Sequence, residues 1–180
     1  MKYVAFLRAI NVGGHVVTMD QLKKLFVGLG FRDAETFIAS GNVVFSSTAK
    51  GTAALEQKIE AGLEKKLGYE VRTFLRSGAE VATIAAGQPF KPAVMKAATV
   101  INVGFMAEPL SAEQVKTLLG YRCDVDEFAA VGREVYWLCR TRSSESPFFK
   151  VRFEKVVGAA VSFRNMNTVV RLTDKYGFAG

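Results

Sequence analysis

The feature of this sequence that most constrains its fold is an order of helix and strand patterns that occurs twice. In the first part of the chain, apolar spacing predicts six elements in order: strand 3–7, helix 22–29, strands 36–39 and 43–45, helix 55–67 and strand 71–75. A short helix follows and stops before Pro89. The order β-α-β-β-α-β is that of the ferredoxin-like, split βαβ arrangement.

The same order returns in the second part. The patterns there predict strands 99–105, 127–130, 134–138 and 161–163, with helices 111–119, 146–157 and 167–176. We therefore expect an α+β protein made of two tandem ferredoxin-like halves that pack together, residues 1–91 and residues 92–180. The junction falls at residues 88–92, a short stretch with two prolines.

A residue match between the two predicted hairpins favours an internal duplication. Gly41 and Phe45 match Gly132 and Tyr136 at a constant offset of 91 residues, since 132 minus 41 and 136 minus 45 are equal. Two unrelated hairpins can match in this way by chance. The shared order of elements makes an internal repeat the better explanation.

Composition places the chain among soluble proteins. Of its 180 residues, 49% are hydrophobic and 23% are charged, which allows a sizeable core and argues against disorder. The apolar start is short and is interrupted by Arg8, and no apolar run approaches the roughly 20 residues that cross a membrane. We expect a cytoplasmic protein with no membrane partner.

Metal and cofactor chemistry find little support in the sequence. His15 is the single histidine, and Cys123 and Cys139 lack metal-ligand spacing. Both cysteines are expected to be reduced and buried. No Walker loop, dinucleotide fingerprint, carboxylate pair or nucleophile–base arrangement occurs. The expectation is therefore no metal site and no cofactor.

The charge balance is basic, with a formal net charge of +7. Residues 140–180 carry eight basic and three acidic side chains, so most of the excess lies there. A basic face can attract phosphates, nucleic acid or anionic lipid, or it can simply be a solvated surface. RNA recognition by base stacking is disfavoured, because the strands that would carry the rings lack aromatic residues at alternating positions.

The first candidate site is the loop that follows the first strand. Arg8, Asn11, Gly13 and Gly14 occur there, directly before the first helix. Adjacent glycines let a backbone approach a ligand and present its N–H groups, and an arginine supplies a fork of donors for phosphate or carboxylate. The alternative is a turn that merely needs positive φ. The corresponding loop of the second half, residues 106–110, lacks both glycines and the asparagine.

Two further segments have a similar polar character. Ser40, Gly41 and Asn42 separate the strands of the first hairpin, where Asn42 can simply occupy a left-handed turn position. Arg164 and Asn165 precede the last helix, for which Asn167 is the expected N-cap. The three segments together would offer arginine, asparagine, serine and backbone donors, which suit anion or amide recognition better than acid–base catalysis.

These motifs resemble a bacterial family of uncharacterised proteins, DUF1697. The resemblance is carried by residues 7–14, 40–45, 89–90 and 164–165 with Thr168, and it runs from about residue 1 to about residue 175. It implies an α+β fold with ferredoxin-like parts and implies no activity. Nine candidate positions match the family motifs: Arg8, Asn11, Gly13, Gly14, Ser40, Gly41, Asn42, Arg164 and Asn165. Met166 departs from the tryptophan that is usual there.

Three hypotheses for function follow. The first is a binding protein for a phosphate-bearing anion, such as a nucleotide or a nucleic acid backbone, that uses the nine residues above. The second is a small metal-independent hydrolase or transferase, with the same donors as an oxyanion site and His15 as general base. The third is a homodimeric interaction protein that pairs through a sheet edge or an apolar patch. The sequence leaves the ligand, catalysis and the oligomeric state open.

Overall fold

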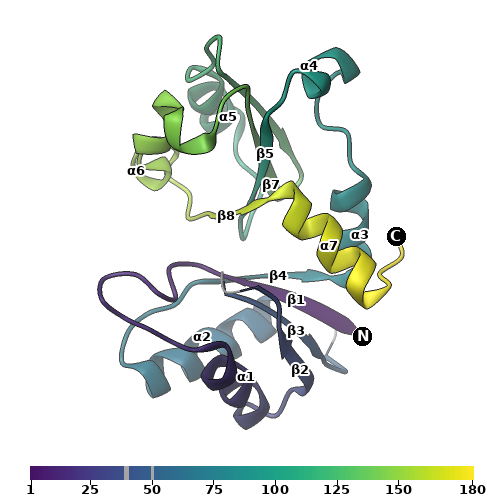
Figure 1. The fold of residues 1–180 in the computed structure, drawn as a ribbon. Helices are drawn as coiled ribbons and strands as arrows, with labels where there is room; N and C mark the ends of the chain where they lie inside the picture. The colour runs from purple at the N-terminus through teal and green to yellow at the C-terminus, as the bar shows by residue number, and fades with distance from the viewer. Residues whose placement is uncertain (39–40, 50) are drawn as a thin grey trace. The chain divides into compact units, whose positions relative to one another are not determined.

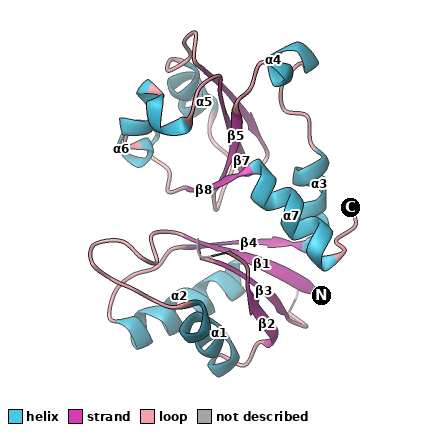
Figure 2. Ribbon diagram, in the orientation of Figure 1, coloured by secondary structure: helices cyan, strands magenta, loops and turns pink. Residues whose placement is uncertain are grey.

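The computed structural model describes residues 1–38, 41–49 and 51–180. The described chain forms two compact units. The first unit contains Met1–Ile84 and Leu172–Gly180, and the second contains Ala85–Arg171. Within the described residues the fold is mixed α+β, with two four-stranded antiparallel sheets and seven α-helices. Figure 2 distinguishes the helices from the strands by colour.

The sheet of the first unit has the strand order β2-β3-β1-β4. Its strands are β1 (Lys2–Leu7), β2 (Arg32–Thr36), β3 (Asn42–Ser46) and β4 (Thr73–Ser77). Two long helices, α1 (Met19–Gly28) and α2 (Ala53–Leu67), lie side by side on one face of this sheet (Figure 1). A third helix, α3 (Gly78–Ala86), follows β4 directly.

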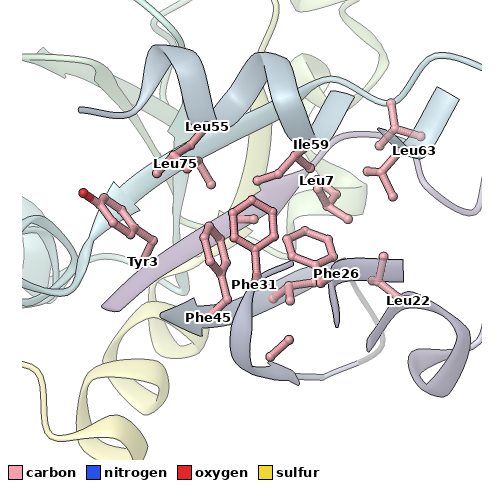
Figure 3. Packing of buried hydrophobic residues seen from close by; sticks show 14 of the residues in the cluster. Tyr3, Leu7, Leu22, Phe26, Phe31, Phe45, Leu55, Ile59, Leu63 and Leu75 are labelled. Carbon is pink, nitrogen blue, oxygen red and sulfur yellow. The ribbon is translucent and has the colours of Figure 1, made fainter. Parts of the chain in front are cut away.

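An apolar core lies between this sheet and the two helices. Alternate residues of the strands point into it, because successive side chains of a strand face opposite sides of the sheet. Phe45 of β3 is fully buried, and its ring lies 5.6 Å from that of Phe26 and 4.4 Å from that of Phe31. Figure 3 shows these rings beside Leu7 of the central strand and Ile59 of α2.

The sheet of the second unit has the order β6-β7-β5-β8. Its strands are β5 (Val100–Phe105), β6 (Asp126–Val131), β7 (Glu134–Cys139) and β8 (Ser162–Asn165). The α-helices that belong to this part of the chain are α4 (Pro92–Lys96), α5 (Ala112–Leu119), α6 (Phe153–Val157) and the start of α7 (Met166–Tyr176). In chain order, the two sheets therefore repeat one arrangement of strands.

The sequence rules for helix ends hold at several places. Thr18 and Ser111 each form the expected capping box with a glutamine three residues later. Ser77 and Glu80 make the same reciprocal pair of bonds, at 2.7 and 3.2 Å. Gly68 ends α2 with a φ of 82°, a left-handed conformation that suits glycine.

The predicted helix at residues 146–157 is wrong. The segment instead contains a 3₁₀ turn, η2 (Pro147–Lys150), and then α6, with another 3₁₀ turn, η1 (Ser143–Glu145), just before it. Val151 and Arg152 interrupt the segment with extended or irregular backbone angles. Phe148 and Phe153 both reach the core of the second unit. Side-chain burial therefore overrides the helical spacing that the sequence suggested.

The residue match at an offset of 91 does not agree with the strand faces. Phe45 points into the helix-covered core of the first unit. In the second unit the corresponding core takes Val135 and Trp137, while Tyr136 between them lies on the opposite face. Side chains alternate between the two faces of a strand. An alignment that is wrong by an odd number of residues therefore pairs side chains that lie on opposite faces of the two sheets. The two sheets share one strand order, and the duplication and the boundary at residues 91 and 92 stay predictions.

The C-terminal residues pack on the first unit. The Tyr176 hydroxyl donates a hydrogen bond of 3.0 Å to Glu35 of β2, and its ring meets that of Phe37 edge-on. Phe178 lies so close to Gly78 that a Cβ there would come within 2.7 Å of its ring. The end of the chain is thus part of the first unit's structure.

A membrane-crossing element is not found among the helices of the described residues, because none has the necessary length and apolar character.

Two helical glycines give a matched test of the packing between α1 and α2. A Cβ on Gly62 would lie 2.2 Å from Leu29 Cδ2, whereas a Cβ on Gly28 would meet nothing within 4 Å. Gly28→Ala should raise the free energy of unfolding by about 0.5–1 kcal/mol or less, because alanine costs less backbone entropy. Gly62→Ala should lower it by about 1–3 kcal/mol through overpacking. Urea unfolding measures both, and equal stabilisation by the two changes would contradict the close approach.

Candidate functional site

Two of the three candidate segments meet at one end of β1. The strands that flank β1 run antiparallel to it, so their first residues lie beside its last ones. The Leu7 amide donates to the Gly41 carbonyl at 2.9 Å, and the Arg8 amide donates to the Arg72 carbonyl at 2.8 Å. The glycine loop and the hairpin turn therefore begin from neighbouring positions in the first unit.

Gly41 is required by this arrangement. Its φ is +77°, and a Cβ there would lie 3.0 Å from Ile10 Cγ2 and 3.3 Å from Leu7 Cβ. A larger residue would face both an unfavourable backbone conformation and a steric contact. Gly41 thus has a structural role in bringing the turn against the strand. Ser40, the neighbouring candidate, lies outside the described residues.

Asn42 is fully buried and also has a clear structural role. Its side-chain amide donates to the Phe37 carbonyl at 2.9 Å, and the Phe37 amide donates to the Asn42 carbonyl at the same distance. These two bonds close the turn of the hairpin. The structural alternative for Asn42 therefore has direct support, although through turn closure by its side chain and not through a positive φ.

Several contacts hold the glycine loop, among them a turn in which the His15 amide donates to the Val12 carbonyl at 3.4 Å across Gly13 and Gly14. The Asn11 side chain accepts a hydrogen bond of 2.7 Å from the Val17 amide, which ties the start of the loop to its end. The Tyr69 hydroxyl donates to the Ile10 carbonyl at 2.8 Å. The His15 ring stacks on Tyr69 with 3.8 Å between ring centroids. The loop is thus a defined structure, and His15 contributes to it by stacking.

Gly13 and Gly14 differ from Gly41, because packing does not require them. Both have positive φ, 70° and 85°, yet a Cβ on Gly14 would meet nothing within 4 Å. Both residues are exposed. Within residues 1–38, 41–49 and 51–180, no hydrogen bond is found for either amide. These two N–H groups therefore remain available to an acceptor.

Arg164 and Asn165 belong to β8 in the second unit. Arg164 is only 9% exposed, and its Nη1 donates to Ser162 Oγ at 2.9 Å and to the Phe163 carbonyl at 2.8 Å. Burial lowers the pKa of Arg164 to about 10, so the guanidinium stays charged at neutral pH. The pairing register places Arg164 opposite Val103, within the edge strand β8 and one residue before its end.

Asn165 has a local structural duty that the sequence did not reveal. Its side-chain oxygen accepts a hydrogen bond of 2.9 Å from the Asn167 amide at the start of α7. The expectation that Asn167 caps this helix is therefore corrected, because the capping oxygen comes from Asn165. A shared site of Arg164 and Asn165 with the glycine loop stays a prediction.

A buried polar cluster in the second unit was missed by sequence reasoning. Asp126 is fully buried, and its carboxylate accepts hydrogen bonds from Trp137 Nε1 at 2.8 Å and from Ser146 Oγ at 2.7 and 2.8 Å. The thiols of Cys139 and Cys123 lie 3.4 and 3.6 Å from the same carboxylate. The available signal was the aspartate in a β-prone segment, which needs partners when buried.

This cluster has the character of a structural network. Burial, reinforced by Asp126, raises the pKa of Cys139 to about 12, so this thiol is not a nucleophile at neutral pH. Cys123 is exposed, which corrects the expectation that both cysteines are buried. Among the described side chains, no group of three or more histidine, cysteine, aspartate or glutamate residues is placed to hold a metal ion.

Comparison with known proteins gives a family and a fold. Residues 1–136 match the model of a family described as "Protein of unknown function (DUF1697)". The matched segment contains the glycine loop and the turn at Gly41, and it ends before Arg164. The search among curated proteins gives no significant match.

One solved structure is similar over nearly the whole chain. It is described as "The structure of conserved bacterial protein SP0830 from Streptococcus pneumoniae", and it superposes with a TM-score of 0.74. The two sequences are 22% identical, and the alignment covers 96% of this chain and 97% of that one. At this level of identity the likeness shows a shared fold and nothing about activity.

The two cysteines should differ sharply in reactivity. At pH 8 a thiol reagent such as Ellman's should titrate Cys123 in the folded protein, because that residue is exposed. Cys139 should react only after unfolding, since it is buried and its pKa is raised to about 12. Counting the released chromophore before and after adding guanidinium measures this. Two fast thiols in the folded protein would contradict the buried cluster.

Asn42 and Asn11 should differ in their effect on stability. Asn42→Ala removes a buried hydrogen bond and leaves the Phe37 carbonyl without this partner, which should cost about 1–3 kcal/mol. Asn11→Ala removes a bond on the surface and should cost about 0.5–1 kcal/mol. Denaturant unfolding compares the two variants. If Asn42→Ala were as mild as Asn11→Ala, closure of the turn by this side chain would be wrong.

Proposed function

This chain belongs to the DUF1697 family of proteins of unknown function, and from its own geometry we propose that it binds a phosphate-bearing anion at the glycine loop of the first unit. The ligand would be a nucleotide, a related phosphate compound or a nucleic acid backbone. The site consists of Arg8, Asn11, Gly13 and Gly14, with Gly41 and Asn42 supporting it from the neighbouring turn.

The observation that carries this proposal is the pair of exposed amides at Gly13 and Gly14. Positive φ at two successive residues holds this part of the loop in a shape that other residues adopt only at a cost. Packing does not explain Gly14, and the Asn11–Val17 bond keeps the loop closed. Successive backbone N–H groups of this kind form concave binding sites for anions in many proteins.

Arg8 adds the charge that a phosphate requires. It lies directly after β1, where its backbone is fixed by the bond to Arg72, so its side chain starts from a defined position. A guanidinium can donate two parallel hydrogen bonds to a phosphate, and such charge-assisted bonds are stronger than neutral ones. Ser40, Arg164 and Asn165 remain predicted members of the site.

The catalytic alternative has less support. His15, the proposed base, stacks on Tyr69, and that contact already accounts for its position in the loop. Cys139 and Ser146 are buried around Asp126 and are hydrogen-bonded there. A homodimer likewise has no specific observation in its favour. We therefore keep binding as the single proposed function.

The two sheets also bear on the origin of the fold. We propose that they derive from duplication of one ferredoxin-like half, with residues 1–91 and 92–180 as the two copies. Support comes from the strand orders β2-β3-β1-β4 and β6-β7-β5-β8, which are equivalent position by position. A cytoplasmic location is also proposed, and it rests on the composition alone.

Arg8→Ala should weaken binding of inorganic phosphate, nucleotides or short oligonucleotides by about tenfold or more, because a charge-assisted hydrogen bond contributes about 1.5–3 kcal/mol. Calorimetric titration at low and moderate salt measures this. Arg32→Ala is the matched control, since Arg32 is an exposed arginine of the same unit. The proposal fails if no phosphate compound binds at low salt, or if both variants bind as tightly as the unchanged protein.

A further inference from the structure

A groove lies between α1 and α2 in the first unit. Its cavity volume is about 670 Å³, which lies within the range of about 300–1,000 Å³ that small-molecule sites occupy. The walls are largely apolar and include Val16, Leu25 and Leu67. Three lysines also line it, Lys24 from α1 and Lys65 and Lys66 from α2.

Gly28 lines this groove, and the structure gives no packing reason for a glycine at this position. Its φ is not in the left-handed region, and a Cβ there would meet nothing within 4 Å. Neither backbone conformation nor packing therefore demands glycine at this helical position, where alanine would be more stable. Gly62 on the facing helix is different, since it makes room for Leu29. Gly28 thus keeps the wall of the groove open at a cost in helix stability.

Most apolar residues of the groove, among them Leu25 and Leu67, are half-buried against the core of the unit, and Val16 is the exposed one. Val16 is 80% exposed, although it lines a concave surface where apolar contact is available. Burying such side chains against an apolar group is favourable by about 25 cal/mol for each Å² removed from water. An apolar chain in the groove would cover them.

The lysines indicate the charge that the other end of such a ligand would carry. Lys24 shares an exposed ion pair of 3.1 Å with Asp20, one turn earlier on the same helix. Lys65 and Lys66 lie in the last turn of α2, where the negative end of the helix dipole stabilises their charge. Three ammonium groups around an apolar groove are complementary to an acidic headgroup joined to an apolar tail.

We propose that the α1–α2 groove binds a small anionic amphiphile, with its apolar tail between the helices and its phosphate or carboxylate headgroup on Lys24, Lys65 and Lys66. The groove adjoins the end of the glycine loop, because Val16 and Val17 line it, but Arg8, Gly13 and Gly14 do not. The groove proposal can therefore be tested independently of the proposed anion site at Arg8.

The probe is dodecyl phosphate below its critical micelle concentration, with dodecanoate to compare headgroups and inorganic phosphate to represent the headgroup alone. Calorimetric titration should show saturable binding of both amphiphiles, with the groove as the tighter site. Binding of dodecyl phosphate should be at least about tenfold tighter than that of inorganic phosphate, because each buried CH₂ contributes about 0.8 kcal/mol. Absence of saturable amphiphile binding would overturn the proposal.

Variants locate the tail. Gly28→Phe places a ring in the groove, and Val27→Phe places the same ring on the preceding residue of α1, which does not line the groove. Gly28→Phe should weaken dodecyl phosphate binding by about tenfold or more, while Val27→Phe changes it by less than about twofold. Equal effects of the two rings would contradict the groove as the site.

Variants of the lysines locate the headgroup. The double change Lys65→Ala and Lys66→Ala should weaken amphiphile binding by about fivefold at low salt, in line with exposed charge pairs. Lys23→Ala with Lys116→Ala removes the same charge elsewhere and should have little effect. Arg32→Ala, which changes an exposed arginine outside the groove, should leave dodecanoate binding unchanged. If phosphate binds at Arg8 but dodecyl phosphate binds no tighter, the groove inference fails and the proposed function stands.

Discussion

The hydrogen bond between the Leu7 amide and the Gly41 carbonyl is the contact on which the first unit's candidate site depends. It fixes the end of the central strand against the turn of the hairpin at 2.9 Å. Gly41 allows this approach because a Cβ would press on Ile10 and Leu7. The glycine loop starts at the next residue, so its shape follows from this anchoring and from the Asn11 and Tyr69 contacts further along.

Much of the fold could be predicted from local signals. The capping boxes at Thr18, Ser77 and Ser111 and the glycine end of α2 formed as short-range chemistry requires. The helix at residues 146–157 failed because Phe148 and Phe153 are placed by long-range burial, which helical spacing alone does not register. The residue match between the two hairpins paired side chains that lie on opposite faces of their sheets. An alignment of similar residue types does not show which face of a strand each side chain occupies.

The candidate site was predictable in part. Glycines beside an arginine pointed to the loop, and the antiparallel pairing of β1 and β3 brings Gly41 to it. The residue types did not separate ligand contacts from structural ones, and Asn42 and Asn165 prove to hold their own backbone. The Asp126 cluster and the α1–α2 groove were not foreseen, because both arise from residues that meet only after the elements pack.

The central claim is that the glycine loop presents backbone donors to a phosphate, and amide chemical shifts test it most directly. In a titration of isotope-labelled protein with inorganic phosphate followed by two-dimensional NMR, the Gly13 and Gly14 amide signals should move progressively and saturate. Amides that gain no new partner, such as that of Leu7 bonded to Gly41, should stay nearly fixed. Saturation at other residues, with the two glycine signals unmoved, would contradict the account.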